Sequence, residues 1–327
     1  MSCERIKSLE RVLGSSLEYI LSRQRRDGSW GDWALPPGES SIWTTAFVGC
    51  GLKSLPTGLK ERAWVSTGLA SAWLEERIFS DGGWGYNEEV GSDADSTALA
   101  ILFLTSQGKK VSDVCYECLL SFQRADGGFA TYRGPMDLGS WGVSHADVTP
   151  TAVLAMMTKY SVASTAVDRG LQFVLDHKTA AGVWQPFWWI SFLYSTEVSL
   201  SLLKEVGLNI DLWRTRETLL ETTTQHPFES ALLASSLLLL SGISLDEEIW
   251  PLVAALVEDQ ASDGSWRSGP MLRVTRRDCM EAWKPGDHDR LFSDQNHLFT
   301  TATVLDALSK VYLSLKQTSG ATEEMCL

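Results

Sequence analysis

Three aspartates stand in a sequence context that could support acid chemistry. Asp93 and Asp95 lie one residue apart in GSDADSTA, residues 91–98, directly before an apolar run, and Asp147 precedes another such run. An isolated pair of this kind is most often a helix cap. Carboxyl groups that converge on an apolar cavity cannot all ionise, however, so one of them keeps its proton near neutral pH. A proton held in apolar surroundings is what acid chemistry on an alkene requires.

Aromatic residues stand before or within the corresponding apolar runs elsewhere in the chain. A π face attracts a cation by roughly 0.5–2 kcal/mol, and an aromatic cavity that excludes water also protects a carbocation. Each residue taken singly could equally be core packing. As a set they predict an aromatic wall: Trp43, Phe187, Trp188, Trp189, Phe192, Tyr194, Phe228, Phe292 and Phe299.

The elements that must position these residues come from an internal repeat. Gly-rich turns with a following aromatic recur at intervals of about 45–55 residues, and a degenerate copy lies near Gln225. The clear copies are QRRDGSW at 24–30, DGGW at 81–84, QRADGGF at 123–129, AGVW at 181–184 and QASDGSW at 260–266. A glycine that ends a helix and a tryptophan that packs across repeats explain most of the 14 tryptophans structurally.

After each turn a small hydroxyl residue precedes a run that is apolar on nearly every face, which is typical of a buried helix. Amphipathic stretches such as 69–77 and 114–122 lie between these runs. Six buried helices that alternate with amphipathic ones predict an all-α fold, an (α/α)6 barrel of inner and outer helix pairs in one domain over residues 1–327. The inner helices would then all begin at one end of the barrel, where function is expected.

Composition narrows the partners and the location. The net charge of −13 repels nucleic acid and anionic membranes. We expect no nucleic-acid partner, no obligate protein partner, and a cytoplasmic location with at most weak peripheral membrane contact. The six cysteines are scattered, and Cys115 and Cys118 are expected to share one helix face as reduced thiols. The longest apolar run, near 232–240, is too short to cross a bilayer.

The turns and the acidic segment together resemble the squalene–hopene and oxidosqualene cyclases. The turns resemble that family's QW motifs, in order, over nearly the whole chain, against its catalytic β domain alone. Residues 93–98 (DADSTA) resemble the family's D-x-D-D-T-A motif, and residues 147–149 (DVT) resemble its D-V-T-A segment. Residues 182–196 (GVWQPFWWISFLYST) are similar to its G-S-W-Y-G-R-W-G-x-N-Y-x-Y-G-T run.

The resemblance implies roles for individual residues. The middle aspartate of the family motif donates the proton, which makes Asp95 the expected acid. Asp93, Ser96 and Asp147 would orient and polarise Asp95 by hydrogen bonds. Four further residues fall where the family lines its cavity: Trp188, Tyr194, Tyr86 and Tyr132.

Departures from the family pattern narrow the range of substrates that we expect. Ser96 replaces the last aspartate of the motif. Thr151 stands where hopene cyclases have a histidine that assists the acid, and we expect Thr151 to contact the substrate. Residues 291–297 resemble the family's G-F-P-G-D-F-Y segment only loosely, and its second helical domain has no counterpart here. We therefore expect a single-domain class II terpene cyclase, an enzyme that cyclises a small isoprenoid, either a prenyl diphosphate or a prenylated aromatic.

Cofactor and terminating groups are less constrained. We expect no metal site and no required cofactor, with Mg²⁺ assisting only if the substrate is a diphosphate. Glu88 and Glu89 could then hold a metal, although surface charge explains them as well. Candidates for a terminating base are His297 and Glu197. If the substrate is a diphosphate, cations should line the cavity mouth, and the candidates are Arg273, Arg276, Arg277 and Lys284.

Three alternatives remain open at this stage. The same barrel resembles the β subunit of zinc-dependent protein prenyltransferases, and DQNH at 294–297 echoes one zinc element, but the aspartate and cysteine of the other are missing near Phe228. A non-catalytic isoprenoid-binding barrel would gain nothing from buried carboxylates. An (α/α)6 glycosidase would use two carboxylates but would need more polar walls.

Overall fold

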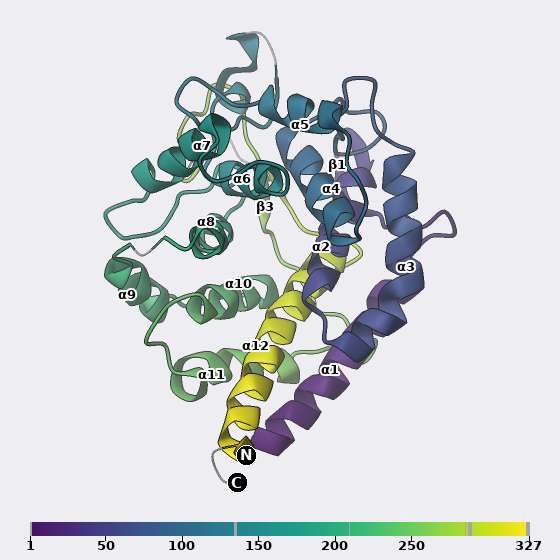
Figure 1. The fold of residues 1–327 in the computed structure, drawn as a ribbon, viewed down its shortest axis with the longest axis vertical. Coiled ribbons are helices and arrows are strands. Elements are labelled where there is room, and N and C mark those ends of the chain that lie inside the picture. Colours follow the sequence, from purple (N-terminus) through teal and green to yellow (C-terminus); the bar gives the residue numbers. More distant parts are fainter. Residues whose placement is uncertain (1, 134–135, 209, 285, 287–289, 325–327) are drawn as a thin grey trace.

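The computed structural model describes residues 2–133, 136–208, 210–284, 286 and 290–324. Over these residues the chain is mostly helical, with 12 α-helices that alternate between two roles along the sequence. Figure 1 shows the helices arranged around a common centre, with α12 and α1 side by side. This arrangement follows from the alternation of apolar and amphipathic segments.

Six helices are apolar on most faces and begin at the predicted hydroxyl-containing positions. In α4 the residues from Ala98 to Ile101 are all buried, which removes nearly every face of the helix from water. Each of these helices contacts the next one in chain order, and the last contacts the first. They are α2 (Ile42–Gly51), α4 (Ala94–Ser106), α6 (Thr149–Met157), α8 (Phe192–Val206), α10 (Pro227–Leu238) and α12 (Leu298–Glu324).

The other six helices cover the apolar ones from outside. Helix α7 is typical, because Val167, Leu171 and Val174 are buried at helical spacing while Arg169 faces solvent. A single stripe of apolar residues is enough for a helix that packs on one side only. These helices are α1 (Ser2–Ser22), α3 (Thr57–Glu75), α5 (Asp113–Leu120), α7 (Thr165–Asp176), α9 (Trp213–Glu221) and α11 (Trp250–Glu258).

The Gly-x-Trp turns hold each outer helix to the inner helix that follows it. The indole N–H of Trp84 donates to the carbonyl of Leu74 at the end of α3, at 2.9 Å. The backbone N–H of Trp84 donates to the hydroxyl of Thr97 in α4, at 3.0 Å. The same pair of bonds recurs at Trp30, Trp184 and Trp266. The small hydroxyl residues at the inner-helix starts are therefore part of the turn.

The turns also join neighbouring repeats. A Cβ atom at Gly264, where φ is +91°, would lie 2.2 Å from the backbone oxygen of Ser15 in α1, so only glycine fits. The side chain of Gln260 donates to the carbonyl of Val12 in the same helix, at 3.0 Å. The turn before the last inner helix thus packs against the first outer helix.

Two short hairpins depart from the all-helical prediction. Strand β1 (Asp32–Leu35) pairs with β2 (Gly38–Ser40), and β3 (Leu272–Val274) pairs with β4 (Arg290–Phe292), both antiparallel. Strands of three or four residues are too short to show a period-2 pattern, which is why the sequence did not reveal them.

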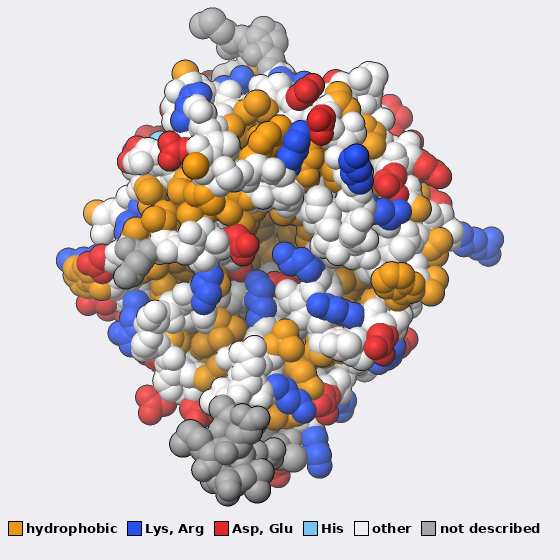
Figure 2. Space-filling model, viewed as in Figure 1, with side chains coloured by type: hydrophobic (Ala, Val, Ile, Leu, Met, Phe, Trp, Pro, Cys, Tyr) orange, Lys and Arg blue, Asp and Glu red, His pale blue; other side chains and the backbone are white. Residues whose placement is uncertain are grey.

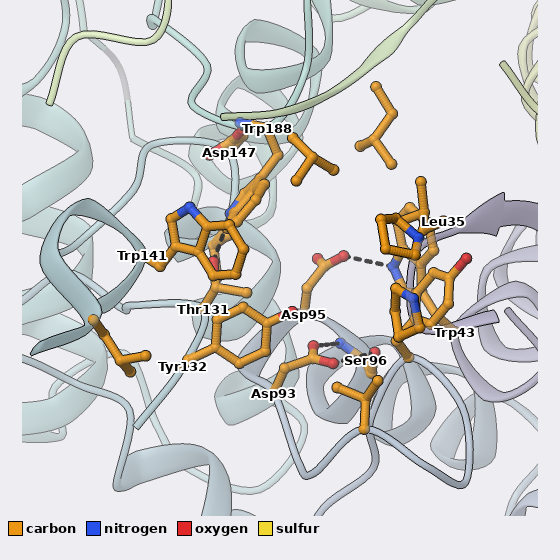
Figure 3. A pocket seen from close by; sticks show the side chains of 18 of the residues that line it. Leu35, Trp43, Asp93, Asp95, Ser96, Thr131, Tyr132, Trp141, Asp147 and Trp188 are labelled. Atoms are coloured by element: carbon orange, nitrogen blue, oxygen red, sulfur yellow. Dashed lines mark hydrogen bonds between the residues drawn. The ribbon is translucent and has the colours of Figure 1, made fainter. Parts of the chain in front are cut away.

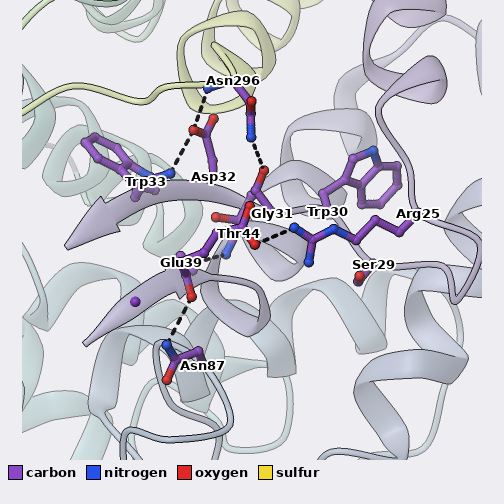
Figure 4. A network of polar contacts seen from close by, with 12 residues as sticks. Arg25, Ser29, Trp30, Gly31, Asp32, Trp33, Glu39, Thr44, Asn87 and Asn296 are labelled. Carbon is purple, nitrogen blue, oxygen red and sulfur yellow. Dashed lines mark hydrogen bonds and ion pairs between the residues drawn. The ribbon is translucent and has the colours of Figure 1, made fainter. Parts of the chain in front are cut away.

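The first hairpin is hydrogen-bonded to two segments that are remote from each other in the sequence. Asp32, in β1, accepts the backbone N–H of Asn296 at 2.8 Å (Figure 4). It also accepts the backbone N–H of Leu298, at the start of α12, at 2.8 Å. Asn87 donates to the carbonyl of Glu39 in β2, at 3.0 Å. These bonds fix the hairpin between the loop that precedes α4 and the loop that precedes α12.

The surface carries charges of both signs. Figure 2 shows acidic and basic side chains distributed over one face, with apolar side chains gathered around a central hollow. Within the described residues, no helix has an apolar stretch long enough to span a bilayer. Cys115 and Cys118 are both buried in α5 as free thiols.

Candidate active site

A cavity of about 640 Å³ opens at the starts of the inner helices. Its wall combines three carboxyl groups with a mainly apolar and aromatic surface (Figure 3). The acidic members are Asp93 and Asp95, from the start of α4, and Asp147, from the loop before α6. Further residues come from the two short hairpins, from the loop around Trp141, from α2 and from the loops before α4 and α8.

Asp93 is the N-cap of α4 and is held by several donors. One carboxylate oxygen accepts the backbone N–H of Ser96 at 2.7 Å, and the other accepts the hydroxyl of Ser96 at 2.8 Å. The serine that stands in place of the family's last aspartate therefore serves Asp93. Burial raises the pKa of Asp93 to about 7 in spite of these bonds.

Asp95 lies in the first turn of α4 and is held by a single donor. The indole N–H of Trp43, at the start of α2, donates to Oδ2 of Asp95 at 2.6 Å (Figure 3). Among the described residues, the buried Oδ1 of Asp95 has no hydrogen-bond partner. An unpartnered buried oxygen costs less in a neutral carboxyl group than in a carboxylate.

Asp147 caps the loop that carries the aromatic wall. Its Oδ2 accepts the backbone N–H groups of Phe187 and Trp188, at 2.9 and 2.7 Å. It therefore fixes the segment 187–189 against the start of α6. Burial raises the pKa of Asp147 to about 6.

The three carboxyl groups differ in how firmly they keep a proton. Burial, followed by the charge of Asp93, raises the pKa of Asp95 to about 8, and the charge of Asp147 adds to this. The pKa values of Asp93 and Asp147 are lower because backbone donors stabilise their charged forms. Asp95 therefore has the highest pKa of the three carboxyl groups.

The structure brings part of the expected aromatic wall into this cavity. The residues that line it are Trp43, Tyr86, Tyr132, Trp188 and Trp189, of which Trp189 forms the floor. The phenol groups of Tyr86 and Tyr132 stay neutral, because burial raises the pKa of both.

The other expected wall residues do not line the cavity. Trp189 covers Tyr194 and Phe228, whose rings stack on it with centroids 4.0 and 5.2 Å away. Trp43 covers Phe299, at 4.4 Å. Tyr194, Phe228 and Phe299 thus form a second layer that supports the floor. Four more expected residues also lie outside the lining: Thr151 in α6, Phe187 before α8, Phe192 in α8 and Phe292 in β4.

Several residues of the lining were not assigned to it from the sequence. Trp141 and Thr131 stand on the loop between α5 and α6, and Leu272 comes from β3. Trp141 could have been found as an aromatic residue in the loop that precedes an inner helix. Thr131 and Leu272 carry no sequence signal, because their place depends on the path of loops.

A buried histidine supports the wall from behind. The ring of His145 lies 2.8 Å from the carbonyl of Ser140 through Nε2 and 3.3 Å from the hydroxyl of Thr131 through Nδ1. Thr131 also accepts the indole N–H of Trp188, at 2.6 Å. Burial lowers the pKa of His145 to about 4, so the ring is neutral. Thr151, at the family's histidine position, is buried in α6 without lining the cavity.

One arginine faces the cavity from its roof. The guanidinium of Arg277 lies 5.2 Å from the ring centre of Trp141, and both residues belong to the lining. The backbone carbonyl of Arg277 accepts the N–H of Ser140 at 2.7 Å, which joins the loop after β3 to the loop around Trp141. Among the described residues, Arg277 has no carboxylate partner within ion-pair distance.

The other candidate cations are engaged elsewhere. Arg273 is buried in β3 and donates to the carbonyl of Trp189 at 2.6 Å. Arg276 pairs with Asp278, and Lys284 pairs with Glu281. A further arginine of the lining, Arg133, forms an ion pair with Asp81.

The remaining candidate residues lie away from the cavity. Glu197 pairs with Lys310 at 3.1 Å, and Glu88 pairs with Arg77 at 2.7 Å. His297 and Glu89 are also outside the lining. Within the described residues, no three His, Cys, Asp or Glu side chains converge in the manner of metal ligands.

Comparison with known proteins agrees with this geometry. Residues 2–129, which include Asp93 and Asp95, match the family described as the squalene-hopene cyclase C-terminal domain. No match was found among curated proteins. The type II terpene cyclase MstE from Scytonema, in its apo form, is 22% identical with a TM-score of 0.82 over 94% of this chain and 98% of MstE. This chain has the fold of a type II terpene cyclase.

Two other solved structures are similar to this chain over different shares of their own length. A protein from Actinoplanes is 23% identical with a TM-score of 0.83, over 93% of this chain and 99% of its own. The ent-copalyl diphosphate synthase from Streptomyces platensis is 16% identical with a TM-score of 0.61, over 82% of this chain but 50% of its own. MstE has also been solved with geranylgeranyl dihydroxybenzoate as substrate and, in another variant, with merosterolic acid A as product. This chain therefore matches nearly the whole length of MstE, but only half the length of the synthase.

Proposed function

We propose that this protein is a class II terpene cyclase that converts a linear prenylated aromatic acid into a polycyclic meroterpenoid. The observation that carries the proposal is the buried carboxyl group of Asp95, which lines an aromatic cavity and accepts a single hydrogen bond through its side chain among the described residues. Asp95 donates its proton to the terminal alkene or epoxide of the folded chain, and a C–H or O–H bond forms. The π electrons of successive double bonds then close the rings, and loss of a proton at the end makes the product an isomer of the substrate.

The walls suit such a cascade. Indole and phenol rings stabilise cations through their faces without acting as strong nucleophiles. The volume of about 640 Å³ falls within the range of ligand pockets, roughly 300–1,000 Å³. Trp43 stands on one side of the acid, and Tyr132 and Trp188 stand on the other (Figure 3). The ring of Tyr86 lies 6.1 Å from that of Trp43. An isoprenoid chain between these residues would meet π faces along its length.

The head group is proposed from the charge at the roof. Arg277 offers one guanidinium without an acidic partner among the described residues, which suits a single carboxylate. A diphosphate carries more charge and commonly recruits several cations or Mg²⁺. The substrate named for MstE, geranylgeranyl dihydroxybenzoate, is a carboxylic acid of the proposed class.

The architecture that we propose for this function is one closed (α/α)6 barrel over residues 1–327. It is supported by the contacts of each inner helix with the next, and of α12 with α2. The packing of the last Gly-x-Trp turn against α1 supports it as well. We further propose that cyclisation needs no cofactor, because a carboxyl group supplies the proton and the cascade has no redox step.

The test is incubation of the purified protein with farnesyl and geranylgeranyl chains, each offered as a diphosphate and as a prenylated dihydroxybenzoic acid, followed by mass spectrometry. We expect an isomeric cyclised product from a prenylated acid, in the presence or absence of EDTA. Asp95→Asn should lower the rate by roughly 10²–10⁴-fold, because it removes the general acid. Arg277→Gln should raise KM for the acid by roughly 10–100-fold and leave a prenylated phenol without carboxylate unaffected.

Asp113→Asn is the matched control, since Asp113 is an exposed aspartate on α5 that pairs with Lys159. Cyclisation by Asp95→Asn at the wild-type rate would refute the role of Asp95 as the general acid. Turnover of the diphosphates alone, with dependence on Mg²⁺, would refute the proposal that the substrate carries a carboxylate head group. Binding of every isoprenoid without conversion would favour a carrier.

A further inference from the structure

Trp43 relates to the acid differently from the other aromatic residues of the cavity. Its indole N–H is directed at Oδ2 of Asp95, with a nitrogen–oxygen distance of 2.6 Å, while its ring lines the cavity. Asp93 and Asp147 each accept two hydrogen bonds from neighbouring groups. Among the described residues, Asp95 accepts only this one through its side chain. The orientation and the pKa of the Asp95 carboxyl group thus depend on one hydrogen-bond donor.

The indole is held rigidly by its neighbours. Its ring centre lies 4.4 Å from that of Phe299, 5.9 Å from Trp33 and 6.1 Å from Tyr86. Rings packed at these separations cannot swing the N–H away from Asp95 without disturbing the floor of the cavity. The hydrogen bond is therefore built into the packing of α2 against α4.

The bond distinguishes the two oxygens of Asp95. Because Trp43 can only donate, Oδ2 acts as an acceptor, which suits the carbonyl oxygen of a neutral carboxyl group. The acidic proton is then left on Oδ1, which has no partner among the described residues. A carboxyl group with its proton on one defined oxygen is oriented before the substrate arrives.

We propose that Trp43 is the positioning residue of the acid, which assigns the proton to one oxygen of Asp95 and stabilises the carboxylate left after proton transfer. This inference rests on the proposed function. Its chemistry is balanced, because Asp95 loses a proton to the alkene while the indole N–H remains bonded to Oδ2 throughout. The N–H of Trp43 then stabilises the Asp95 carboxylate, and its ring face stabilises the new carbocation of the substrate.

The other titratable groups around Asp95 do not stabilise its carboxylate. Asp93 on α4 and Asp147 before α6 are acceptors that disfavour the carboxylate of Asp95. Tyr132, Tyr194 on α8 and Cys50 on α2 stay neutral, because burial raises the pKa of each. None of the five is a cation. A hydrogen bond to a charged group contributes about 1.5–3 kcal/mol, which corresponds to roughly 10–100-fold in rate.

The test is to replace Trp43 by benzothienylalanine, which keeps the bicyclic ring and lacks the N–H. Loss of the donor raises the pKa of Asp95 above about 8, because the bond favours the carboxylate. We expect the alkaline limb of kcat/KM to move to higher pH and the rate on the plateau to fall roughly 10–100-fold. Trp43→Phe should shift the limb in the same direction.

The matched control is the same replacement at Trp188, whose N–H donates to Thr131 in the same cavity. It should leave the alkaline limb in place. The infrared carbonyl band of protonated Asp95, identified by its loss in Asp95→Asn, is titrated in the substrate-free protein, and circular dichroism verifies folding. An unmoved limb and an unmoved band after replacement of Trp43 would overturn the inference. If no isoprenoid is cyclised, the proposed function fails, while the infrared titration still decides the role of Trp43.

Discussion

At the scale of single residues, hydrogen-bond donors decide which carboxyl group keeps its proton. Asp93 and Asp147 each receive two donors, whereas Asp95 receives one. Among the described residues, Oδ1 has no hydrogen-bond partner in either Asp95 or Asp147. Burial raises the pKa of Asp95 most, and the negative charge of Asp93 raises it further. Asp93 is thus both a helix cap and a charge that favours the protonated form of its neighbour.

This division of labour predicts the effect of Asp93→Asn on the pH profile. Asparagine can still accept the N–H of Ser96, so the N-cap of α4 is retained. Removal of the charge lowers the pKa of Asp95 from about 8. The alkaline limb of kcat/KM should therefore move to lower pH, opposite to the shift expected for Trp43. Asp263→Asn, at an exposed turn, is the control, and a limb that stays in place would contradict the field of Asp93.

The acidic residues could be predicted from the sequence, whereas much of the wall could not. Asp95 and Asp147 stand at inner-helix starts, and the periodicity of the repeat fixes those positions. Trp141 and Arg277 reach the cavity only because two loops join through the bond between Ser140 and the carbonyl of Arg277. Such a bond is specified by loop geometry, for which the sequence offers no regular pattern.

At the scale of elements, the Gly-x-Trp turn couples each outer helix to the next inner one. A helix end leaves carbonyl groups without partners, and the indole N–H satisfies one of them. The hydroxyl at the start of the inner helix binds the same tryptophan from the other side. The bonds recur in four turns, and Phe129 keeps only the backbone half, with Thr149 at 2.9 Å.

Trp84→Phe tests this coupling. Trp84 is fully buried, so the change leaves the carbonyl of Leu74 unpaired and opens a cavity. We expect the free energy of unfolding to fall by about 2–4 kcal/mol in urea denaturation. Trp64→Phe is the matched control, because Trp64 is 73% exposed on α3 and should change stability by less than about 0.5 kcal/mol. Equal losses in the two variants would contradict the role of the turn.

The same turns explain why the helices were predictable and the hairpins were not. Long apolar runs that follow a fixed signal place α2, α4 and α12 within a few residues. Strands β1 and β4 contain four and three residues, and their pairing is set by contacts with loops remote in sequence. One of these contacts, from Asp32 to the start of α12, spans nearly the whole chain.

At the scale of the whole molecule, a cavity built to hold a proton should cost stability at high pH. The pKa values of Asp93, Asp95 and Asp147 are raised in the folded state from 3.8 to about 7, 8 and 6. The folded protein therefore binds more protons than the unfolded chain between about pH 4 and pH 8. His145, whose pKa is lowered to about 4, opposes this only below its ordinary value of 6.5.

The melting temperature should consequently fall between about pH 6 and pH 8.5, as the contribution of the raised carboxyl groups is lost. Asp95→Asn cannot ionise, so its melting temperature should fall less over this range and exceed that of the wild type at about pH 8.5 by at least about 2 °C. Asp113→Asn, at a surface aspartate with a lowered pKa, should follow the wild-type slope. Parallel curves for the wild type and Asp95→Asn in differential scanning calorimetry would mean that Asp95 is already ionised in the folded protein. Since the acid step requires the protonated form, this one measurement links the stability of the fold to its proposed chemistry.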